Sequence, residues 1–202
     1  MTPGWVLVIP VKGPGGKSRL EHPDRAELAS AIALDTLEVA CRARNVSDVV
    51  LVCSDEEFVA NALRLDPGHA DLWVVPDPGA GLNAAIAAGL DAVEVDQPRA
   101  VMLGDLPALD PADLDGALAR AEAHARAFTP DAEGTGTTLV TARPGEHLAP
   151  AFGADSAARH AASGFVRLEV RADSTLRRDV DTAEQLRAAA SLGLGPRTSA
   201  LL

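Results

Sequence analysis

WVLVIPVKGPGGKSRL, residues 5–20, joins a short apolar run directly to a glycine-rich loop. The run, residues 5–11, shows no alternation of apolar and polar side chains, which is typical of a strand buried on both faces of a parallel sheet. The loop contains three glycines and both lysines of the chain, Lys12 and Lys17. Because glycines let backbone N–H groups approach an anion closely, the stretch predicts a strand that leads into a phosphate-binding loop.

The same kind of apolar run recurs three more times, with helical patterns between the runs. Asp110 and Pro111 are residue types that favour the start of a helix after the last run. Alternating strands and helices predict an α/β fold, a three-layer α/β/α sandwich with a mostly parallel, Rossmann-like sheet. The further strands are expected at 49–53, 72–75 and 100–103, and the helices at 26–44, 56–65, 82–93 and 111–127.

The last third of the chain has a different pattern. Residues 129–141 are rich in turn formers and lead into a strand, and a short helix over 155–163 ends at Gly164. A strand near 165–170 and an extended segment over 176–181 precede a helix that begins at Thr182. The sequence contains no repeat or linker, so residues 1–202 are predicted to form a single domain. Residues 194–202 are expected to be a loosely held tail.

Composition excludes several classes of protein. The net charge of −11 argues against nucleic-acid binding, which needs a basic surface. The apolar runs are too short to span a bilayer and no targeting pattern precedes them, so we expect a cytoplasmic protein without membrane contact. The two cysteines, Cys41 and Cys53, fall in a predicted helix and strand and are expected to be buried, reduced thiols.

The glycine loop does not match the common nucleotide-binding motifs. Gly16-Lys17-Ser18 resembles the end of a P-loop, but Val11 occupies the position of the first glycine of that motif. No G-x-G-x-x-G motif is present either. The loop nevertheless offers Lys17 and Arg19 to neutralise a triphosphate and departing pyrophosphate. The alternative is an ordinary surface loop with solvated cations.

Three aspartates form a candidate metal site. Asp105 closes the fourth apolar run, where a side chain reaches the ligand crevice of an open α/β sheet. Asp179 and Asp181 are two residues apart, so in an extended chain they face the same side. Three carboxylates together with phosphate oxygens suit Mg²⁺. The alternatives are a turn or cap role for Asp105, and a helix cap formed by Asp181 or Thr182 with Glu184 or Gln185.

Two segments of the last third predict a small anion pocket. FGADS, residues 152–156, places a glycine before a helix start and then a hydroxyl at the helix cap, and GTGT, residues 134–137, adds hydroxyls on flexible backbone. The alternative is a helix cap and a hairpin turn. Arg159 and His160 either assist this pocket or lie on the surface.

These segments, in this order, resemble the guanylyltransferases of deazaflavin (coenzyme F-420) biosynthesis, which use 2-phospho-L-lactate or phosphoenolpyruvate. The resemblance covers almost the whole chain. One departure is Gly16, where the family has an alanine before the loop lysine. The matching stretches are VKGPGGKSRL at 11–20, GLNAAI at 81–86, LGDLPAL at 103–109, GTGT at 134–137, FGADSAARH at 152–160 and RRDVDT at 177–182.

The resemblance implies a fold similar to that of sugar-nucleotide and molybdenum-cofactor nucleotidyltransferases. It implies a role for each candidate residue. GTP would bind over the first loop, and the phosphate of the small acid would bind in the anion pocket. The implied nucleotide contacts are Lys12, Gly15, Gly16, Lys17 and Asn83; the acid contacts are Thr137, Gly153 and Ser156; the Mg²⁺ ligands are Asp105, Asp179 and Asp181; and the catalytic groups are Lys17, Arg19 and Asp105.

The implied reaction is guanylyl transfer from GTP to the small acid, followed by delivery of the product to a transferase that loads the deazaflavin precursor. The acid already carries an anionic nucleophile, so positioning and charge stabilisation replace a strong general base. The composition is similar to that of the actinobacterial members, which favours phosphoenolpyruvate over 2-phospho-L-lactate. Two alternatives stay open: a nucleotidyltransferase for a sugar phosphate or molybdopterin, and a nucleotide-binding regulator without catalysis.

Overall fold

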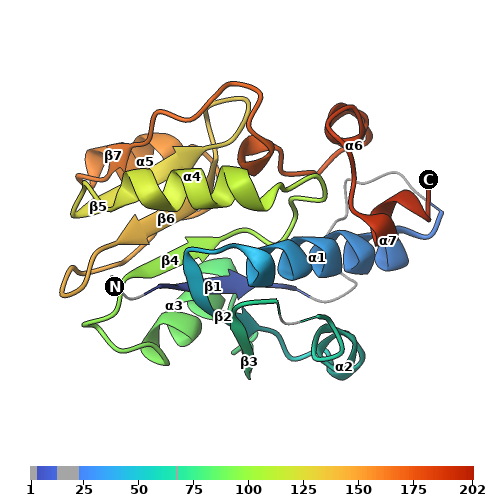
Figure 1. Ribbon diagram of the computed structural model, residues 1–202, viewed down its shortest axis with the longest axis horizontal. Helices are drawn as coiled ribbons and strands as arrows, with labels where there is room; N and C mark the ends of the chain where they lie inside the picture. Colours follow the sequence, from blue (N-terminus) through green and yellow to red (C-terminus); the bar gives the residue numbers. More distant parts are fainter. Residues whose placement is uncertain (1–3, 13–22, 67) are drawn as a thin grey trace.

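A central sheet with the strand order β3-β2-β1-β4-β6-β5-β7 organises the protein (Figure 1). The computed structural model describes residues 4–12, 23–66 and 68–202 of the chain. The strands are β1 Trp5–Pro10, β2 Val46–Val52, β3 Asp71–Val75, β4 Arg99–Met102, β5 Arg126–Pro130, β6 Thr137–Ala142 and β7 Val166–Arg167. The helices are α1 Arg25–Arg42, α2 Glu56–Ala62, α3 Leu82–Asp91, α4 Pro111–Ala121, α5 Ser156–Ala162, α6 Ala183–Ala190 and α7 Pro196–Ser199, with a 3₁₀ turn η1 at Thr175–Arg177.

The sheet is mostly parallel, as the apolar runs predict. β1 pairs in parallel with both β2 and β4, and β2 pairs in parallel with β3. β6 runs antiparallel to β4 and β5, its neighbours on either side, and β7 is parallel to β5. Because β6 pairs with β4, the last third of the chain lies beside β4. The candidate site residue Asp105 follows the end of that strand.

Helices cover both faces of the sheet, which explains why its strands do not alternate with polar residues. In β1, Val6 and Val8 pack in one cluster with Ile86 of α3. Leu7 and Ile9 pack in the opposite cluster with residues of α1 and α4. Figure 1 shows α1 and α4 lying over one face of the sheet. The predicted three-layer α/β/α sandwich is confirmed.

Two local predictions are wrong. The helix predicted over 111–127 ends at Ala121, and residues 126–130 form β5 instead. The alanine-rich sequence favours a helix, but pairing with β6, for example Phe128 with Val140, decides the conformation. The segment 176–181 is not extended throughout, because Thr175–Arg177 forms a 3₁₀ turn. The Asp113 carboxylate accepts hydrogen bonds from both the backbone N–H and the hydroxyl of Thr175 and holds this turn in place.

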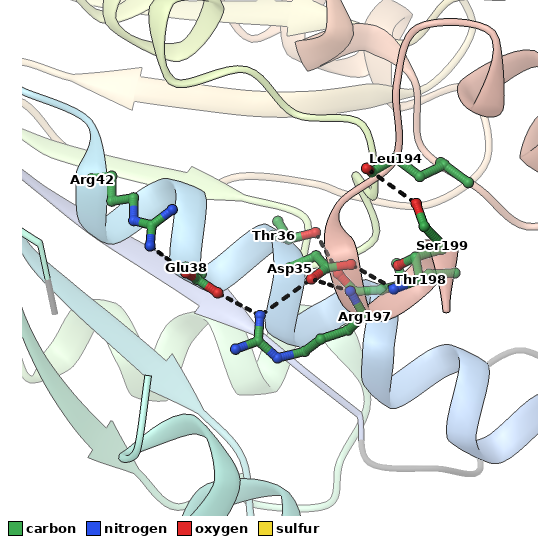
Figure 2. Close-up of polar contacts among 9 residues, drawn as sticks. Asp35, Thr36, Glu38, Arg42, Leu194, Arg197, Thr198 and Ser199 are labelled. Atoms are coloured by element: carbon green, nitrogen blue, oxygen red, sulfur yellow. Dashed lines mark hydrogen bonds and ion pairs between the residues drawn. The ribbon is translucent and has the colours of Figure 1, made fainter. Parts of the chain in front are cut away.

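Residues 194–202, which the sequence predicts to be a loosely held tail, make specific contacts with α1 in the structure. α7 packs against α1, and the backbone N–H groups of Arg197 and Thr198 donate to the buried Asp35 carboxylate at 3.2 and 2.8 Å. The Arg197 guanidinium forms ion pairs with Asp35 and Glu38 (Figure 2). The composition of the tail gave no sign of this docking, because its partner carboxylates lie in a helix that is distant in sequence.

Other expectations concern the thiols and membrane contact. Cys41 and Cys53 are free and buried, as predicted. Burial, with smaller contributions from Glu38 and Asp66, raises the pKa of the Cys41 thiol to about 11. In the described part of the chain, no helix combines the length and apolarity needed to cross a membrane.

Candidate active site

A cavity of about 730 Å³ opens at the carboxyl ends of β1 and β4. The chain order reverses between these two strands, since β2 and β3 lie on the side of β1 away from β4. Ligands of open α/β sheets bind at such a switch point. Lys12 and Asp105, which follow β1 and β4, both line the cavity. Its other walls come from α1 (Ala29, Ser30, Ala33), the approach to α3 (Asp77, Gly79, Gly81, Leu82), and two segments of the last third (Asp131 with 135–137, and 152–156).

Asp105, Asp179 and Asp181 line this one cavity, although Asp105 is far from the other two in sequence. Burial, with smaller contributions from the neighbouring charges of Asp105, Asp131 and Asp181, raises the pKa of Asp179 to about 8. Like charges so close together destabilise one another unless a cation lies among them. The structure thus brings together the three carboxylates that the sequence singled out.

The chemistry of this cluster fits a divalent cation. Oδ1 of Asp179 is buried and accepts no hydrogen bond from any described residue. Carboxylate oxygens of Asp131, Glu133 and Asp179 lie within 4.8 Å of one another. A buried carboxylate oxygen without a donor, surrounded by other carboxylates, is a suitable ligand for a hard cation.

Sequence reasoning missed Asp131, a buried residue of the cavity wall. Its two carboxylate oxygens accept hydrogen bonds from the backbone N–H groups of Thr135 and Gly136 at 3.0 and 2.7 Å. A Cβ atom at Gly136 would lie 2.3 Å from Asp131 Oδ2, so this close approach requires glycine. Asp131 therefore folds the loop before Thr137 and adds negative charge beside Asp179. An aspartate directly after a strand is a usable signal, but β5 was not predicted.

Thr137, Gly153 and Ser156, the predicted acid contacts, all line the cavity. Thr137 is the first residue of β6, and Ser156 is the first residue of α5. The N-cap of α5 is Asp155, so the prediction that a hydroxyl caps this helix is wrong. Gly153 has φ +117°, a conformation that residues with a Cβ rarely adopt, and it shapes the turn before α5.

The side-chain amide of Asn83 is hydrogen-bonded to the Phe152 backbone, and its predicted nucleotide contact stays a prediction. Its Nδ2 donates to the Phe152 carbonyl at 3.2 Å, and its Oδ1 accepts from the Phe152 N–H at 3.0 Å. The amide thus joins α3 to the wall that contains Gly153, and Asn83 is not among the described residues that line the cavity. Gly15, Gly16, Lys17 and Arg19 lie outside the described residues, so their predicted roles stay predictions.

The helix-capping alternative and the metal hypothesis are both compatible with the fold. Thr182 caps α6 in a capping box with Gln185. Asp181 is not the cap, and both Asp179 and Asp181 face the cavity. The sequence left open whether Arg159 and His160 assist the anion pocket or lie on the surface. In the structure Arg159 is exposed, whereas His160 is buried, so the surface alternative is wrong for His160.

Comparisons with known proteins agree with this architecture. The MobA-like NTP transferase domain matches residues 26–176. A phosphoenolpyruvate guanylyltransferase of Streptomyces coelicolor is 47% identical over 205 residues, which cover 98% of this chain and 95% of that protein.

Solved structures of Rv0371c from Mycobacterium tuberculosis H37Rv have the same fold. One has a TM-score of 0.63 at 24% identity and covers 95% of this chain and 99% of the other. Rv0371c in complex with manganese has a TM-score of 0.57 at 26% identity, with 94% and 99% covered. The chain therefore belongs to the MobA-like NTP transferase family, in the group of the phosphoenolpyruvate guanylyltransferases, and is a nucleotidyltransferase.

Proposed function

We propose that this protein transfers GMP from GTP to phosphoenolpyruvate, or to 2-phospho-L-lactate, and releases pyrophosphate in coenzyme F-420 biosynthesis. The observation that carries the proposal is the convergence of Asp105, Asp179 and Asp181 on a cavity that Thr137 and Ser156 also line. Carboxylates alone would repel both substrates, so the acidic cluster favours a bound cation, and the hydroxyls offer neutral donors. The name of the 47% identical Streptomyces relative supports the acceptor.

The chemical step needs no strong base. An oxygen of the acid's phosphate forms a bond to the α-phosphorus of GTP, while the bond from that phosphorus to the bridging oxygen breaks. Pyrophosphate leaves with the electron pair. The attacking oxygen is already anionic, so the protein contributes by holding the two reactants in line and stabilising the charge that develops.

The described residues supply two kinds of contact for this work. The hydroxyls of Thr137 and Ser156 and the turn at Gly153 face the cavity, where they would hold the acid's phosphate or carboxylate. Lys12 lines the cavity from the end of β1 and would contact the triphosphate. Lys17 and Arg19 of the following loop are predicted to contact the triphosphate together with Lys12.

A divalent cation, which we propose to be Mg²⁺, would be held by Asp105, Asp179 and Asp181. When bound, it neutralises phosphate charge and polarises the α-phosphate. The buried Oδ1 of Asp179 and the charges around it support this assignment. The manganese complex of Rv0371c supports a divalent ion.

Pyrophosphate release tests the proposal. Purified protein is incubated with Mg²⁺, each NTP in turn, and phosphoenolpyruvate, 2-phospho-L-lactate, a sugar phosphate or no acceptor. We expect release that requires GTP and one of the two acids. Release with a sugar phosphate alone would assign another acceptor. GTP binding without release under any condition would favour a regulator.

A further inference from the structure

His160 of α5 contacts two residues that line the cavity, Thr137 and Phe152, and its own side chain is buried. The residue is 1% exposed. The rings of Phe128, Phe152 and Phe165 surround the imidazole, with centroids 5.9, 5.4 and 5.3 Å from its own. Such a site disfavours a charged ring, and burial, with a smaller contribution from Arg159, lowers the pKa of His160 to about 4. The imidazole is therefore neutral at physiological pH.

Both ring nitrogens of His160 are hydrogen-bonded, and one of the two bonds fixes the tautomer. The backbone N–H of Ala151 donates to Nε2 at 3.0 Å. A backbone N–H can only donate, so Nε2 of the neutral ring carries no proton, and the ring proton is on Nδ1. Nδ1 lies 3.0 Å from the hydroxyl oxygen of Thr137. Nδ1–H is therefore the donor and Thr137 Oγ1 the acceptor.

This polarity determines what Thr137 offers to the cavity. Because the Thr137 oxygen accepts a hydrogen bond from the imidazole Nδ1–H, the hydroxyl proton of Thr137 is directed elsewhere. None of the described residues accepts a hydrogen bond from this hydroxyl, and Thr137 lines the cavity. A hydroxyl that can only donate toward the cavity suits an anionic oxygen.

We propose that His160 is a positioning residue that orients the Thr137 hydroxyl to donate to an anionic oxygen of the acceptor acid. The acceptor part of this inference rests on the proposed function. Nε2 of His160 also accepts a hydrogen bond from the N–H of Ala151. The next residue, Phe152, is hydrogen-bonded through its backbone to the side-chain amide of Asn83. One buried ring thereby connects the two segments of the acid-binding wall.

Two substitutions separate the two hydrogen bonds of the ring. In His160→Asn the amide nitrogen takes the place of Nδ1 and keeps a donor for Thr137, while the acceptor for Ala151 is lost. In His160→Gln the amide oxygen reaches the place of Nε2 and keeps the acceptor, while the donor for Thr137 is lost. Loss of one hydrogen bond to a charged ligand predicts that His160→Gln raises KM for the acid about tenfold, with kcat and the KM for GTP little changed.

His160→Asn is expected to keep the KM of the wild type within about threefold, even if its melting temperature falls as much as that of His160→Gln. Adding His160→Gln to Thr137→Val is expected to raise KM no further, because the imidazole then has no hydroxyl to orient. Thr137→Ser, which keeps the hydroxyl, is expected to retain the response to His160→Gln. Equal rises in KM for both His160 variants, or additive effects with Thr137→Val, would overturn the proposal.

Long-range ¹H–¹⁵N NMR of the free protein provides a readout that is independent of the substrate. His160 is assigned by the loss of its signals in His160→Gln. We expect a neutral ring protonated on Nδ1 at pH 7. A ring protonated on Nε2, or a charged ring, would overturn the proposal whatever the substrate is. If the wild type turns over neither acid, the proposed function is wrong, while the tautomer still decides whether His160 orients Thr137.

Discussion

The backbone N–H of Val180 donates to the backbone carbonyl of Asp105 at 3.0 Å. This bond joins the end of β4 to the residue between Asp179 and Asp181. The Val180 side chain is buried in a cluster with Leu186 of α6, on the other side of the segment. The two flanking carboxylates line the cavity together with Asp105, and this backbone bond holds the two segments of the acidic cluster side by side.

Asp179→Asn tests that cluster. We expect turnover to fall at least roughly 100-fold, as when a preorganised electrostatic group is removed. The variant removes one of several mutually repelling carboxylates, so the melting temperature of the cation-free protein is not expected to fall. Thermal unfolding with and without Mn²⁺ measures the second part: Mn²⁺ should raise the melting temperature of the wild type and have little effect on the variant.

Asp91→Asn is the matched control for this experiment. Asp91 is an exposed residue at the end of α3 and does not line the cavity. The same change of charge there should leave both turnover and the response to Mn²⁺ unaltered. Wild-type turnover in Asp179→Asn would refute the metal assignment.

The sequence predicted the sheet and most of the cavity wall because those features depend on local patterns. Apolar runs without alternation identified the parallel strands, and residues just after them, such as Lys12 and Asp105, reached the cavity as expected. The sequence did not reveal Asp131, because it follows a strand whose conformation depends on pairing with β6. The roles of Asn83 and Asp35 were equally hidden, since their hydrogen-bond partners are distant in sequence.

Asn83→Ala distinguishes its structural role from nucleoside binding. The substitution removes both hydrogen bonds to the Phe152 backbone. The wall that contains Gly153 and Ser156 should loosen, so we expect KM for the acid to rise about tenfold and KM for GTP to stay within about twofold. Steady-state kinetics with each substrate varied separately makes the measurement. A rise confined to the KM for GTP would instead support the prediction that Asn83 contacts the nucleoside.

The buried His160 ring predicts a loss of stability in acid. Its pKa in the folded protein, about 4, is below the ordinary value of 6.5, so the unfolded chain binds the proton more readily. Stability from the neutral ring is complete above about pH 6.5 and is lost as the pH falls toward about 4, by roughly 3 kcal/mol in total. Urea denaturation of the wild type and His160→Gln at pH 7 and pH 4 should show a larger fall in the wild type. Parallel falls would mean that protonation of this ring does not contribute.

The docking of α7 predicts different costs for two arginines that both form ion pairs. Arg197 pairs with Asp35, whose side chain is 2% exposed, whereas Arg171 pairs with Asp173 through side chains that are 78% and 60% exposed (Figure 2 shows the first pair). Removal of a partner from a buried carboxylate leaves a desolvated charge with fewer donors, so Arg197→Ala should lower the free energy of unfolding by about 1–3 kcal/mol. Arg171→Ala should leave the free energy of unfolding almost unchanged, because water replaces an exposed partner.

Asp35→Ala extends the comparison, because Asp35 also accepts from the backbone N–H groups of Arg197 and Thr198. Thr198 is buried, so its N–H would lose its acceptor without gaining water, and we expect a larger loss of stability than in Arg197→Ala. Urea denaturation of the three variants gives the order directly. If Arg197→Ala and Asp35→Ala cost no more than Arg171→Ala, α7 does not stabilise the fold in solution, and the tail is as loosely held as its composition indicated.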